Sequence, residues 1–297
     1  SGSSANLVAL NTLTSPKLGD RAIKAGDEVI GVAAGFPTTV NPILQFGAVP
    51  VFVDVELGTY NIDDSKIEGA ISPKTKAIML AHTLGNPFNV DAVVAICKKH
   101  NLWLIEDCCD ALGTTYREQM VGTFGDIATL SFYPAHHITC GEGGLIVCND
   151  DNLERVIRSF RDWGRGCFCI GKQNITECGA CNQRFSEWLP SMPGEVFDHK
   201  YVYEEIGYNL KPIEVQASML LAQLDKLSEI KRLRQKNHKL LTDVFQKYED
   251  YFILPVAQRN SDVNWFAYPL TIKDNASFKR SELCQYLESH KIQTRPY

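Results

Sequence analysis

No stretch of this 297-residue chain approaches the 18 or so uninterrupted apolar residues that a membrane-spanning helix needs. The opening residues, SGSSAN, also lack the basic and apolar regions of a secretory signal. Both absences argue against a membrane or secreted protein. We therefore expect a cytoplasmic location.

An excess of basic residues is missing as well. The chain has 30 Lys and Arg against 35 Asp and Glu, which gives a net charge of −5. Proteins that bind nucleic acid or an anionic membrane usually present a basic face. We expect neither partner, so any anionic ligand must be bound by a local group of residues.

The ten cysteines are too sparse for a disulfide scaffold in a chain of this length without a secretion signal. Their grouping favours metal binding or catalysis instead, and we expect reduced thiols. A GxGxxG dinucleotide turn, an internal repeat and a low-complexity tract are all absent from the sequence. With 44% hydrophobic residues, the composition is that of a soluble globular protein.

Short β-rich runs alternate with helical patterns through the first half of the chain. The runs at residues 28–32, 49–53, 76–80 and 102–105 resemble buried strands, and the patterns at 39–46, 64–70 and 90–100 resemble helices. This alternation predicts an α/β fold with a mostly parallel, doubly wound sheet.

Changes of pattern divide the chain into three parts. We expect a large cofactor-binding domain at 1–211, a connecting long helix at 212–249 and a small α+β domain at 250–297. The small domain should hold a strand near 266–272 and a helix near 280–290. Residues 161–203 lose periodicity and gather cysteines, which predicts a long functional insertion. Both ends look abrupt, so we expect a truncated small domain and a fragment of a longer chain.

Three segments carry residues that suit a phosphorylated cofactor. Gly2, Ser3 and Ser4 precede a predicted helix, whose free N–H groups favour phosphate, although an ordinary helix cap also accounts for them. Asp107 ends a strand at the ligand-binding edge of the sheet, where a carboxylate can keep a pyridine nitrogen protonated or simply cap a helix. Residues 131–144 form a glycine-rich turn with a serine and two histidines, which could also be plain surface residues.

The order and content of these segments together resemble one known family. The chain is similar to the DegT/DnrJ/EryC1/StrS family of sugar aminotransferases and related dehydratases, which has the aspartate-aminotransferase-like fold of type I PLP-dependent transferases. The resemblance covers the whole chain. It rests on GDEVIGVAAGFPTTVNPILQFGAVPVFVDV (26–55), EDCCDALG (106–113), SFYPAHHITCGEGG (131–144) and EIGYNLKPIEVQAS (205–218).

Residue roles carried over from this family are as follows. The resemblance assigns the cofactor phosphate to Gly2, Ser3, Ser4 and Ser131, ring stacking to Phe36, the pyridinium nitrogen to Asp107 and the neighbourhood of the ring hydroxyl to Asp110. At this last position aminotransferases usually carry glutamine, so Asp110 departs from the family pattern. Asn209, in the GYN motif, would reach the phosphate in the neighbouring subunit, which implies a homodimer.

The aminotransferase motif reads SF, three residues and then the lysine that bonds covalently to PLP, but here that position is His136. Because imidazole cannot form a stable imine with PLP, we do not expect ordinary transamination here. With a reference pKa of about 6.5, imidazole can instead act as a base near neutral pH. Loss of the lysine is also compatible with an inert protein.

The sequence SFYPAHHIT closely resembles the keto-sugar 3-dehydratases of 3,6-dideoxyhexose biosynthesis, which bind PMP without a covalent link. This resemblance implies a PMP-dependent C3 dehydrase or deoxygenase of a nucleotide-diphospho-4-keto-6-deoxyhexose, in lipopolysaccharide O-antigen synthesis. His136 would remove a proton from the C4′ methylene of PMP as the 3-hydroxyl leaves. His137 would support the pocket, although motif alignment alone does not decide which imidazole is the base.

The cysteines supply a second argument. Four thiolates can hold either a 2Fe-2S cluster or zinc. The CDP-4-keto-6-deoxyglucose 3-dehydrase branch that the chain resembles carries a 2Fe-2S cluster, which implies the ligands Cys109, Cys167, Cys169 and Cys181 here, with Cys178 as the alternative to Cys181. The resemblance further implies an NADH-dependent iron-sulfur flavoprotein reductase as the electron donor.

The sequence supports three hypotheses. The first is the PMP and 2Fe-2S dependent enzyme acting on CDP-4-keto-6-deoxy-D-glucose. The second is a cluster-free 3-dehydratase of a GDP-keto sugar, and the third is an inert PLP-binding scaffold or regulatory protein.

Overall fold

The computed structural model describes residues 1–166 and 184–296. A six-stranded sheet in the order β2-β1-β3-β4-β7-β8 forms its centre. Neighbouring strands are parallel except for β7 and β8, which are antiparallel. The strands of this sheet are β1 (Glu28–Gly31), β2 (Val49–Phe52), β3 (Thr75–Ala81), β4 (Trp103–Asp107), β7 (Ile127–Ser131) and β8 (Gly144–Val147). The predicted mostly parallel sheet is confirmed.

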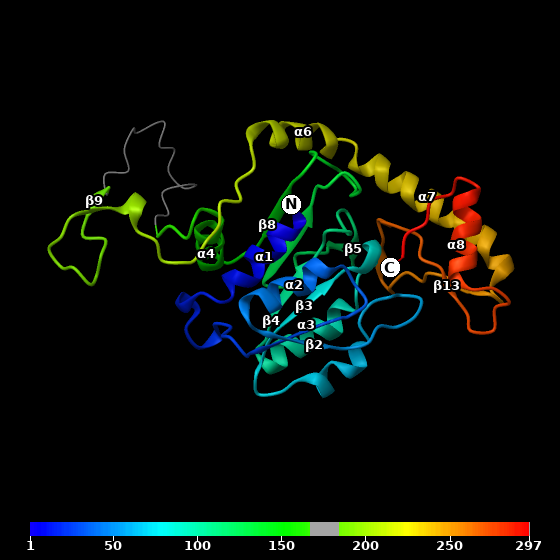
Figure 1. The fold of residues 1–297 in the computed structure, drawn as a ribbon, viewed down its shortest axis with the longest axis horizontal. Coiled ribbons are helices and arrows are strands. Elements are labelled where there is room, and N and C mark those ends of the chain that lie inside the picture. The colour runs from blue at the N-terminus through cyan, green and yellow to red at the C-terminus, as the bar shows by residue number, and fades with distance from the viewer. Residues whose placement is uncertain (167–183, 297) are drawn as a thin grey trace.

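Helices cover both faces of this sheet (Figure 1). Leu10 of α1, Ile43 of α2 and Leu153 of α4 pack into the apolar core on one face, and Val93 of α3 packs into the core on the other. The helices of this domain are α1 (Gly2–Thr12), α2 (Pro37–Phe46), α3 (Val90–His100) and α4 (Asp151–Arg161). Short 3₁₀ helices lie between them at η1 (Pro16–Arg21), η2 (Asp64–Lys66), η3 (Glu68–Ala70) and η4 (Thr83–Gly85).

Successive side chains of β4 alternate between the two cores, as the pleat of a strand requires. Leu104 belongs to the core under α3, and Ile105 belongs to the core under α1. The two acidic residues that end the strand follow the same alternation. Glu106 therefore faces the α3 side, and Asp107 faces the α1 side.

The second half of the chain crosses the sheet domain and ends in a smaller part. Figure 1 shows α6 and α7 passing along one edge of the sheet domain toward α8 and β13, with β9 at the opposite end of the molecule. The elements are β9 (Phe185–Ser186), β10 (Phe197–Asp198), η5 (His199–Tyr201), α6 (Glu214–Leu224), α7 (Leu227–Phe245), η6 (Gln246–Tyr248), β11 (Phe252–Ile253), β12 (Ser261–Asp262), β13 (Thr271–Ile272) and α8 (Arg280–Ser289). β12 pairs with the hairpin β5 (Thr115–Tyr116) and β6 (Gln119–Met120), which ties the C-terminal part to the sheet domain. Within the described residues, no helix combines the length and apolar character needed to cross a membrane.

Three predicted elements differ from the structure. The segment 64–70 forms two 3₁₀ turns, since it is short and contains a glycine. The single connecting helix is instead two helices, because Lys226 N bonds Gln223 O and tightens the chain between α6 and α7. The strand at 266–272 is reduced to β13, since Phe266 N bonds Leu84 O in the η4 turn rather than a neighbouring strand.

Candidate active site

The predicted phosphate-binding residues meet where α1 begins beside the end of β7. A Cβ atom built on Gly2 would lie 2.5 Å from Cβ and 2.9 Å from Oγ of Ser131, and 2.9 Å from Sγ of Cys109. Ser131 itself is buried. Only a residue without a side chain lets the helix approach the strand this closely, so the fold brings Gly2, Ser131 and Cys109 together.

The start of α1 has the properties of an anion site. Ser1 caps the helix, and its Oγ accepts a hydrogen bond from Ser4 N at 3.2 Å. The first amides of a helix have no intrahelical acceptor, and the helix dipole favours negative charge there. The first turn carries no acidic residue that would repel a phosphate. The α1 amides and the Ser131 hydroxyl, which we call the phosphate cradle, are therefore donors of the kind that binds a phosphate group.

Asp107 lies at the carboxyl end of β4 on the same side of the sheet. Its Oδ2 accepts hydrogen bonds from Asn6 Nδ2 at 2.7 Å and from Thr39 Oγ1 at 2.8 Å. Its Oδ1 accepts a single backbone bond from Cys109 N at 3.1 Å. A carboxylate has about four acceptor positions, so Asp107 is held firmly and keeps capacity for one more donor, as a pyridinium N–H would be.

Asp110 and His136 face each other in this part of the structure. His136 Nδ1 lies 3.3 Å from Asp110 Oδ1, although the N–H is not aligned as a full hydrogen bond. Burial raises the pKa of Asp110, and the nearby His136 and Arg234 oppose that shift. The rings of Tyr133 and Phe266 lie 6.4 and 5.3 Å from the His136 ring, between centroids. The His136 imidazole therefore has one polar neighbour and two aromatic walls.

His137 has a different environment from its neighbour. It is buried, and its Nε2 lies 3.0 Å from the backbone oxygen of Asn264, to which it donates. Burial, assisted by the charges of Arg234 and His136, lowers the pKa of His137 to about 4. A neutral imidazole already bonded to a backbone carbonyl is a structural group rather than an exposed base.

Two further predicted cofactor residues lie away from these contacts. Phe36 is the N-cap residue of α2 and is 66% exposed. Asn209 is exposed and pairs through its backbone with Asp162. Within the described residues, neither side chain makes a hydrogen bond or a ring contact.

One of the predicted metal ligands can be located. Cys109 lies beside Gly2 and next to Asp107, and burial together with the charge of Asp107 raises the pKa of its thiol. The remaining predicted ligands lie outside the described residues; they are Cys167, Cys169, Cys178 and Cys181.

Glu106 and His82 form a separate buried pair on the α3 side of the sheet. His82 Nε2 lies 3.0 Å from Glu106 Oε2, and both side chains are fully buried. Although burial alone raises the pKa of Glu106, the hydrogen bonds from His82 and the backbone lower it. Together with Cys108 these residues could approach the geometry of a metal site. The Glu106 oxygens, however, already accept from the amides of residues 122, 124 and 125, so the pair serves to fix that turn.

Sequence reasoning missed four residues that shape this site: Asn6, Thr39, Arg234 and Asn264. Thr39 lies within the GFPTTVNP motif and Asn6 follows the phosphate turn, so both could have been found as polar residues in otherwise apolar helices. Arg234 donates to the backbone oxygens of Trp265 and Phe266 at 3.1 and 2.9 Å. It is one of many cations in its helix, and no sequence signal distinguishes it.

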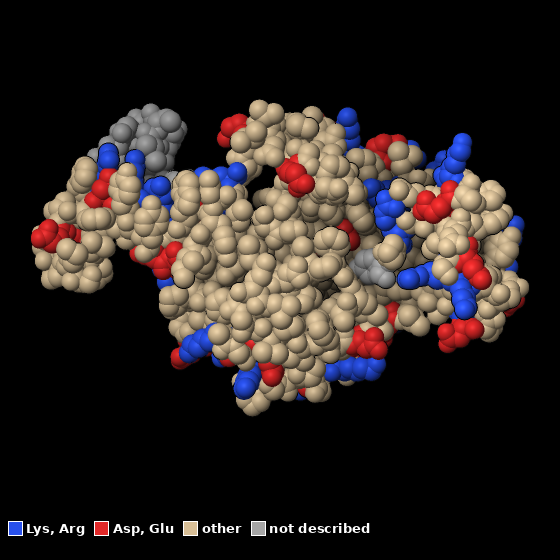
Figure 2. Space-filling view, viewed as in Figure 1, with Lys and Arg blue, Asp and Glu red and all other residues tan. Residues whose placement is uncertain are grey.

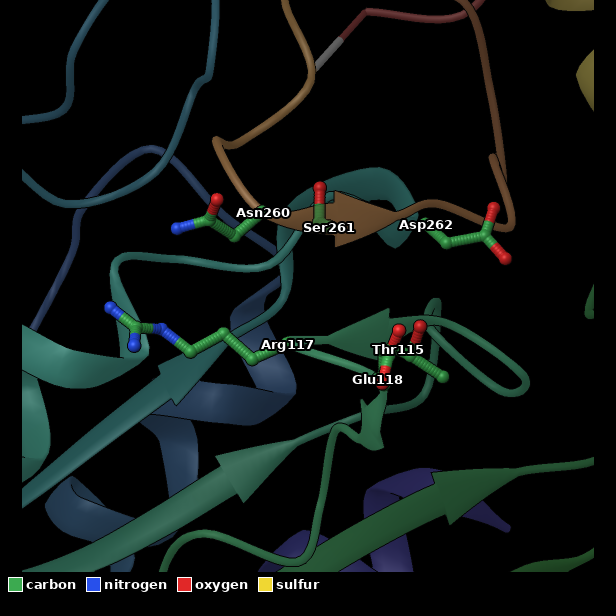
Figure 3. Close-up of a pocket in the computed structure, with 6 residues that line it drawn as sticks. All are labelled: Thr115, Arg117, Glu118, Asn260, Ser261 and Asp262. Carbon is green, nitrogen blue, oxygen red and sulfur yellow. The ribbon is translucent and has the colours of Figure 1, made fainter.

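A cavity of about 580 Å³ lies where β12 meets the β5–β6 hairpin. Figure 3 shows the residues of the β12 segment opposite those of the hairpin; the lining residues are Thr115, Arg117, Glu118, Asn260, Ser261 and Asp262. They differ from the residues predicted for the cofactor. Arg117 and Asp262 are already paired with Asp91 and Lys231, respectively. This cavity marks the join of the C-terminal part to the sheet domain rather than the cofactor site.

Comparison with known proteins gives a consistent result. The sequence model described as the DegT/DnrJ/EryC1/StrS aminotransferase family matches residues 1–297. The chain is 56% identical over 295 residues to the lipopolysaccharide biosynthesis protein RfbH of Salmonella typhimurium, covering 99% of this chain and 66% of that protein. It is 50% identical over 295 residues to the dTDP-4-dehydro-2,6-dideoxy-D-glucose 3-dehydratase of Saccharopolyspora spinosa, covering 99% and 63%. The chain thus spans about two thirds of the length of these relatives.

Solved structures give the same fold. The E. coli GDP-4-keto-6-deoxy-D-mannose-3-dehydratase with bound hydrated PLP aligns with a TM-score of 0.84 at 31% identity, covering 99% of this chain and 71% of that one. The predicted type I, aspartate-aminotransferase-like fold is confirmed.

Proposed function

The chain belongs to the DegT/DnrJ/EryC1/StrS aminotransferase family, and from that membership we propose that it is a PMP-dependent 3-dehydratase of a nucleotide-linked 4-keto-6-deoxyhexose rather than an aminotransferase. The observation that carries this proposal is His136. It occupies the position of the family's lysine, and its Nδ1 faces the Asp110 carboxylate. Two relatives named as sugar 3-dehydratases support the same reaction class.

The proposed cofactor site uses the residues described above. The α1 amides at Gly2 and Ser3, the Ser4 and Ser131 hydroxyls and the Asp107 carboxylate would hold phosphate and pyridine nitrogen, with Phe36 over the ring. The chemistry that PMP supplies when bound is an amine for the sugar ketone and a ring that spreads negative charge. Asp107, fixed by Asn6 and Thr39, would keep the ring nitrogen protonated.

His136 would carry the proton in this reaction. A carboxylate beside Nδ1 favours the tautomer with the proton on Nδ1, which leaves Nε2 as the basic nitrogen. The long Asp110 contact is typical of ligand-free sites, whose catalytic hydrogen bonds often shorten on binding. The Tyr133 and Phe266 rings would limit access of water. His137, bonded to Asn264, would support the pocket without exchanging protons.

For the substrate we favour CDP-4-keto-6-deoxy-D-glucose, in 3,6-dideoxyhexose synthesis. The names of two relatives include dTDP- and GDP-linked keto sugars. The CDP choice rests on the cysteine set, through the resemblance to the CDP branch.

We further propose a 2Fe-2S cluster on Cys109, Cys167, Cys169 and Cys181, with Cys178 as the alternative fourth ligand. The position of Cys109 beside Asp107 and the phosphate cradle supports a route for electrons into the cofactor site. A separate NADH-dependent iron-sulfur flavoprotein would supply those electrons. Anaerobic purification with iron analysis and EPR tests the cluster. Cys109→Ser should lower the iron content, whereas the control Cys284→Ser should not.

A homodimer in which Asn209 reaches the phosphate of the partner is part of the proposal. Figure 2 shows that charged side chains gather mainly at the ends and rim of one face, while its centre, over α1, α2 and β8, is largely uncharged. Three apolar side chains of helix α6 are exposed: Val215 (64%), Leu221 (70%) and Leu224 (52%). Apolar, uncharged surface of this kind is typical of subunit interfaces. Light scattering should give twice the chain mass.

The test of the reaction is direct. The protein loaded with PMP is incubated with CDP-4-keto-6-deoxy-D-glucose, and loss of the 3-hydroxyl is followed by mass spectrometry. The wild type should dehydrate the sugar, His136→Asn should not, and the surface control His100→Asn should match the wild type. Glutamate-dependent amination of the sugar by the wild type would contradict the proposal.

A cluster-free dehydratase of a GDP-keto sugar is the second candidate. It is favoured by 32% identity over 296 residues to the GDP-4-keto-6-deoxy-D-mannose 3-dehydratase of E. coli O55:H7. This candidate would be supported if the protein turned over the GDP sugar faster than the CDP sugar. It also requires that a Cys167→Ser and Cys169→Ser double variant keep the same turnover.

A further inference from the structure

The two adjacent histidines contact one short segment from the far end of the chain. His137 Nε2 donates to Asn264 O at 3.0 Å, and the Phe266 ring lies 5.3 Å from the His136 ring and 6.1 Å from the His137 ring, between centroids. We call Asn264, Trp265 and Phe266 the anchor segment. It belongs to the C-terminal part of the chain, whereas the histidines belong to the sheet domain.

The sheet domain holds the anchor segment through several hydrogen bonds. Asn264 is fully buried, its N–H donates to Thr114 Oγ1 at 2.8 Å, and its Nδ2 donates to Leu112 O at 2.8 Å. Phe266 N donates to Leu84 O at 2.8 Å. Because buried amides that lose such partners are costly, these bonds fix the segment's position.

The η4 turn shows how close this docking is. Gly85 has a φ of +93°, and a Cβ built on it would lie 2.3 Å from Asn264 O and 3.0 Å from Phe266 N. Both the backbone angle and the space therefore require glycine. The turn and the anchor segment are packed backbone against backbone.

Helix α7 holds the segment from its other side. Arg234 NH1 donates to the oxygens of both Trp265 and Phe266, and the His238 ring stacks on Trp265 at 3.8 Å between centroids. The backbone of the segment is thus held between the sheet domain and α7.

These contacts place opposite constraints on the two imidazoles. His137 must carry its proton on Nε2 to donate to Asn264 O. His136 has the Asp110 carboxylate beside Nδ1, which favours a proton there and leaves Nε2 free. The Phe266 ring packs against the His136 ring, with 5.3 Å between centroids.

We propose that the anchor segment positions His136, with Phe266 and His137 as positioning residues that keep His136 in the Nδ1–H tautomer. In this proposal, docking of the C-terminal part adds Phe266 to the contacts that Asp110 and Tyr133 already make with His136. The inference rests on the proposed function only in taking His136 as the base. The hydrogen-bonding pattern itself is independent of that role.

The first test observes the tautomers in the cofactor-free protein. Histidine labelled with ¹⁵N reports protonation at each ring nitrogen, and His136→Asn and His137→Gln assign the two signals. We expect Nδ1–H for His136 and Nε2–H for His137. Phe266→Leu should convert His136 to a mixture of tautomers, whereas Phe266→Tyr, which keeps the ring, should not. The control Phe278→Leu, at a ring that contacts Tyr251 and Phe252, should leave both signals unchanged.

The second test is kinetic. Phe266→Leu should lower kcat for sugar dehydration about 10- to 100-fold, as expected when a catalytic group is displaced by about 1 Å, with KM changed less than roughly twofold. If that variant does not fold, His137→Leu and His137→Gln provide a second pair. Glutamine can still donate to Asn264 O, so it should retain more activity than leucine.

The outcomes separate the two claims. A wild type with the expected tautomers but no dehydration contradicts the proposed function and leaves the positioning intact. The positioning role is overturned if the wild type is active and the Phe266→Leu variant keeps both the wild-type tautomers and the wild-type kcat.

Discussion

Replacing Gly2 by alanine tests the phosphate cradle with a single methyl group. The new Cβ would lie 2.5 Å from Ser131 Cβ, about 1 Å inside normal carbon–carbon contact. Overpacking of this kind costs about 1–3 kcal/mol, partly offset by roughly 0.5–1 kcal/mol because alanine is a better helix former. The strain is relieved if the start of α1 moves away from Ser131, which separates the two halves of the cradle.

Phosphate binding should suffer by a similar free energy. A loss of about 1–3 kcal/mol corresponds to a roughly 5- to 150-fold weaker affinity for PMP. Titration of PMP into the cofactor-free protein measures the affinity, and urea unfolding measures stability. The matched control is Gly69→Ala in η3, where a Cβ meets nothing within 4 Å. If Gly2→Ala folds and binds PMP as tightly as the wild type, the start of α1 is not the phosphate site.

Three further predictions concern buried groups. Asp107→Asn should weaken PMP binding and lower the free energy of unfolding, measured in urea, by about 1–3 kcal/mol. Its amide N–H groups would meet the N–H groups of Asn6 Nδ2, so buried donors would be left without an acceptor. Glu106→Gln should destabilise the cofactor-free protein by about 1–3 kcal/mol, because an amide nitrogen would replace one of the two oxygens that accept hydrogen bonds from His82 and the amides of residues 122, 124 and 125. A change below about 0.5 kcal/mol would refute that role. In the folded protein the pKa of His137 is lowered to about 4, whereas in the unfolded chain it is about 6.5. Between about pH 4 and pH 6.5 the unfolded state therefore binds more protons than the folded state. Stability should therefore fall by about 2 kcal/mol from pH 7 to pH 5, and His137→Gln should show a smaller loss.

Local signals in the sequence were sufficient for several elements of the fold. The helix predicted at 90–100 has the bounds of α3, because Asn89 caps its start, cations fill its last turn and Asn101 ends it in a left-handed conformation. Strands β1, β3 and β4 followed from their buried apolar runs. The run at 49–53 does form a strand, but the prediction that it is buried was wrong: β2 lies at the edge of the sheet, where Val49 and Phe52 are exposed. The break between α6 and α7 has no glycine or proline to mark it, so the sequence predicted one helix.

The site was predictable only where one motif carries the residue. Asp107 and Ser131 end neighbouring parallel strands, so their meeting at one edge follows from the fold. The anchor segment could not be predicted, because it contacts residues of the sheet domain that lie more than 100 positions away along the chain. Arg234 could not be predicted either, because its hydrogen bonds to Trp265 and Phe266 depend on how the C-terminal part folds. The different environments of His136 and His137 likewise come from Asp110 and Asn264, which lie on separate elements.

The most direct test of the central claim is proton exchange at the C4′ methylene of PMP. The protein is incubated with PMP and the keto sugar in D₂O, and deuterium at C4′ is measured by mass spectrometry. We expect deuterium to enter with the wild type, with the control His100→Asn and, more slowly, with His137→Gln, but not with His136→Asn. Full exchange in His136→Asn would contradict the assignment of His136 as the base.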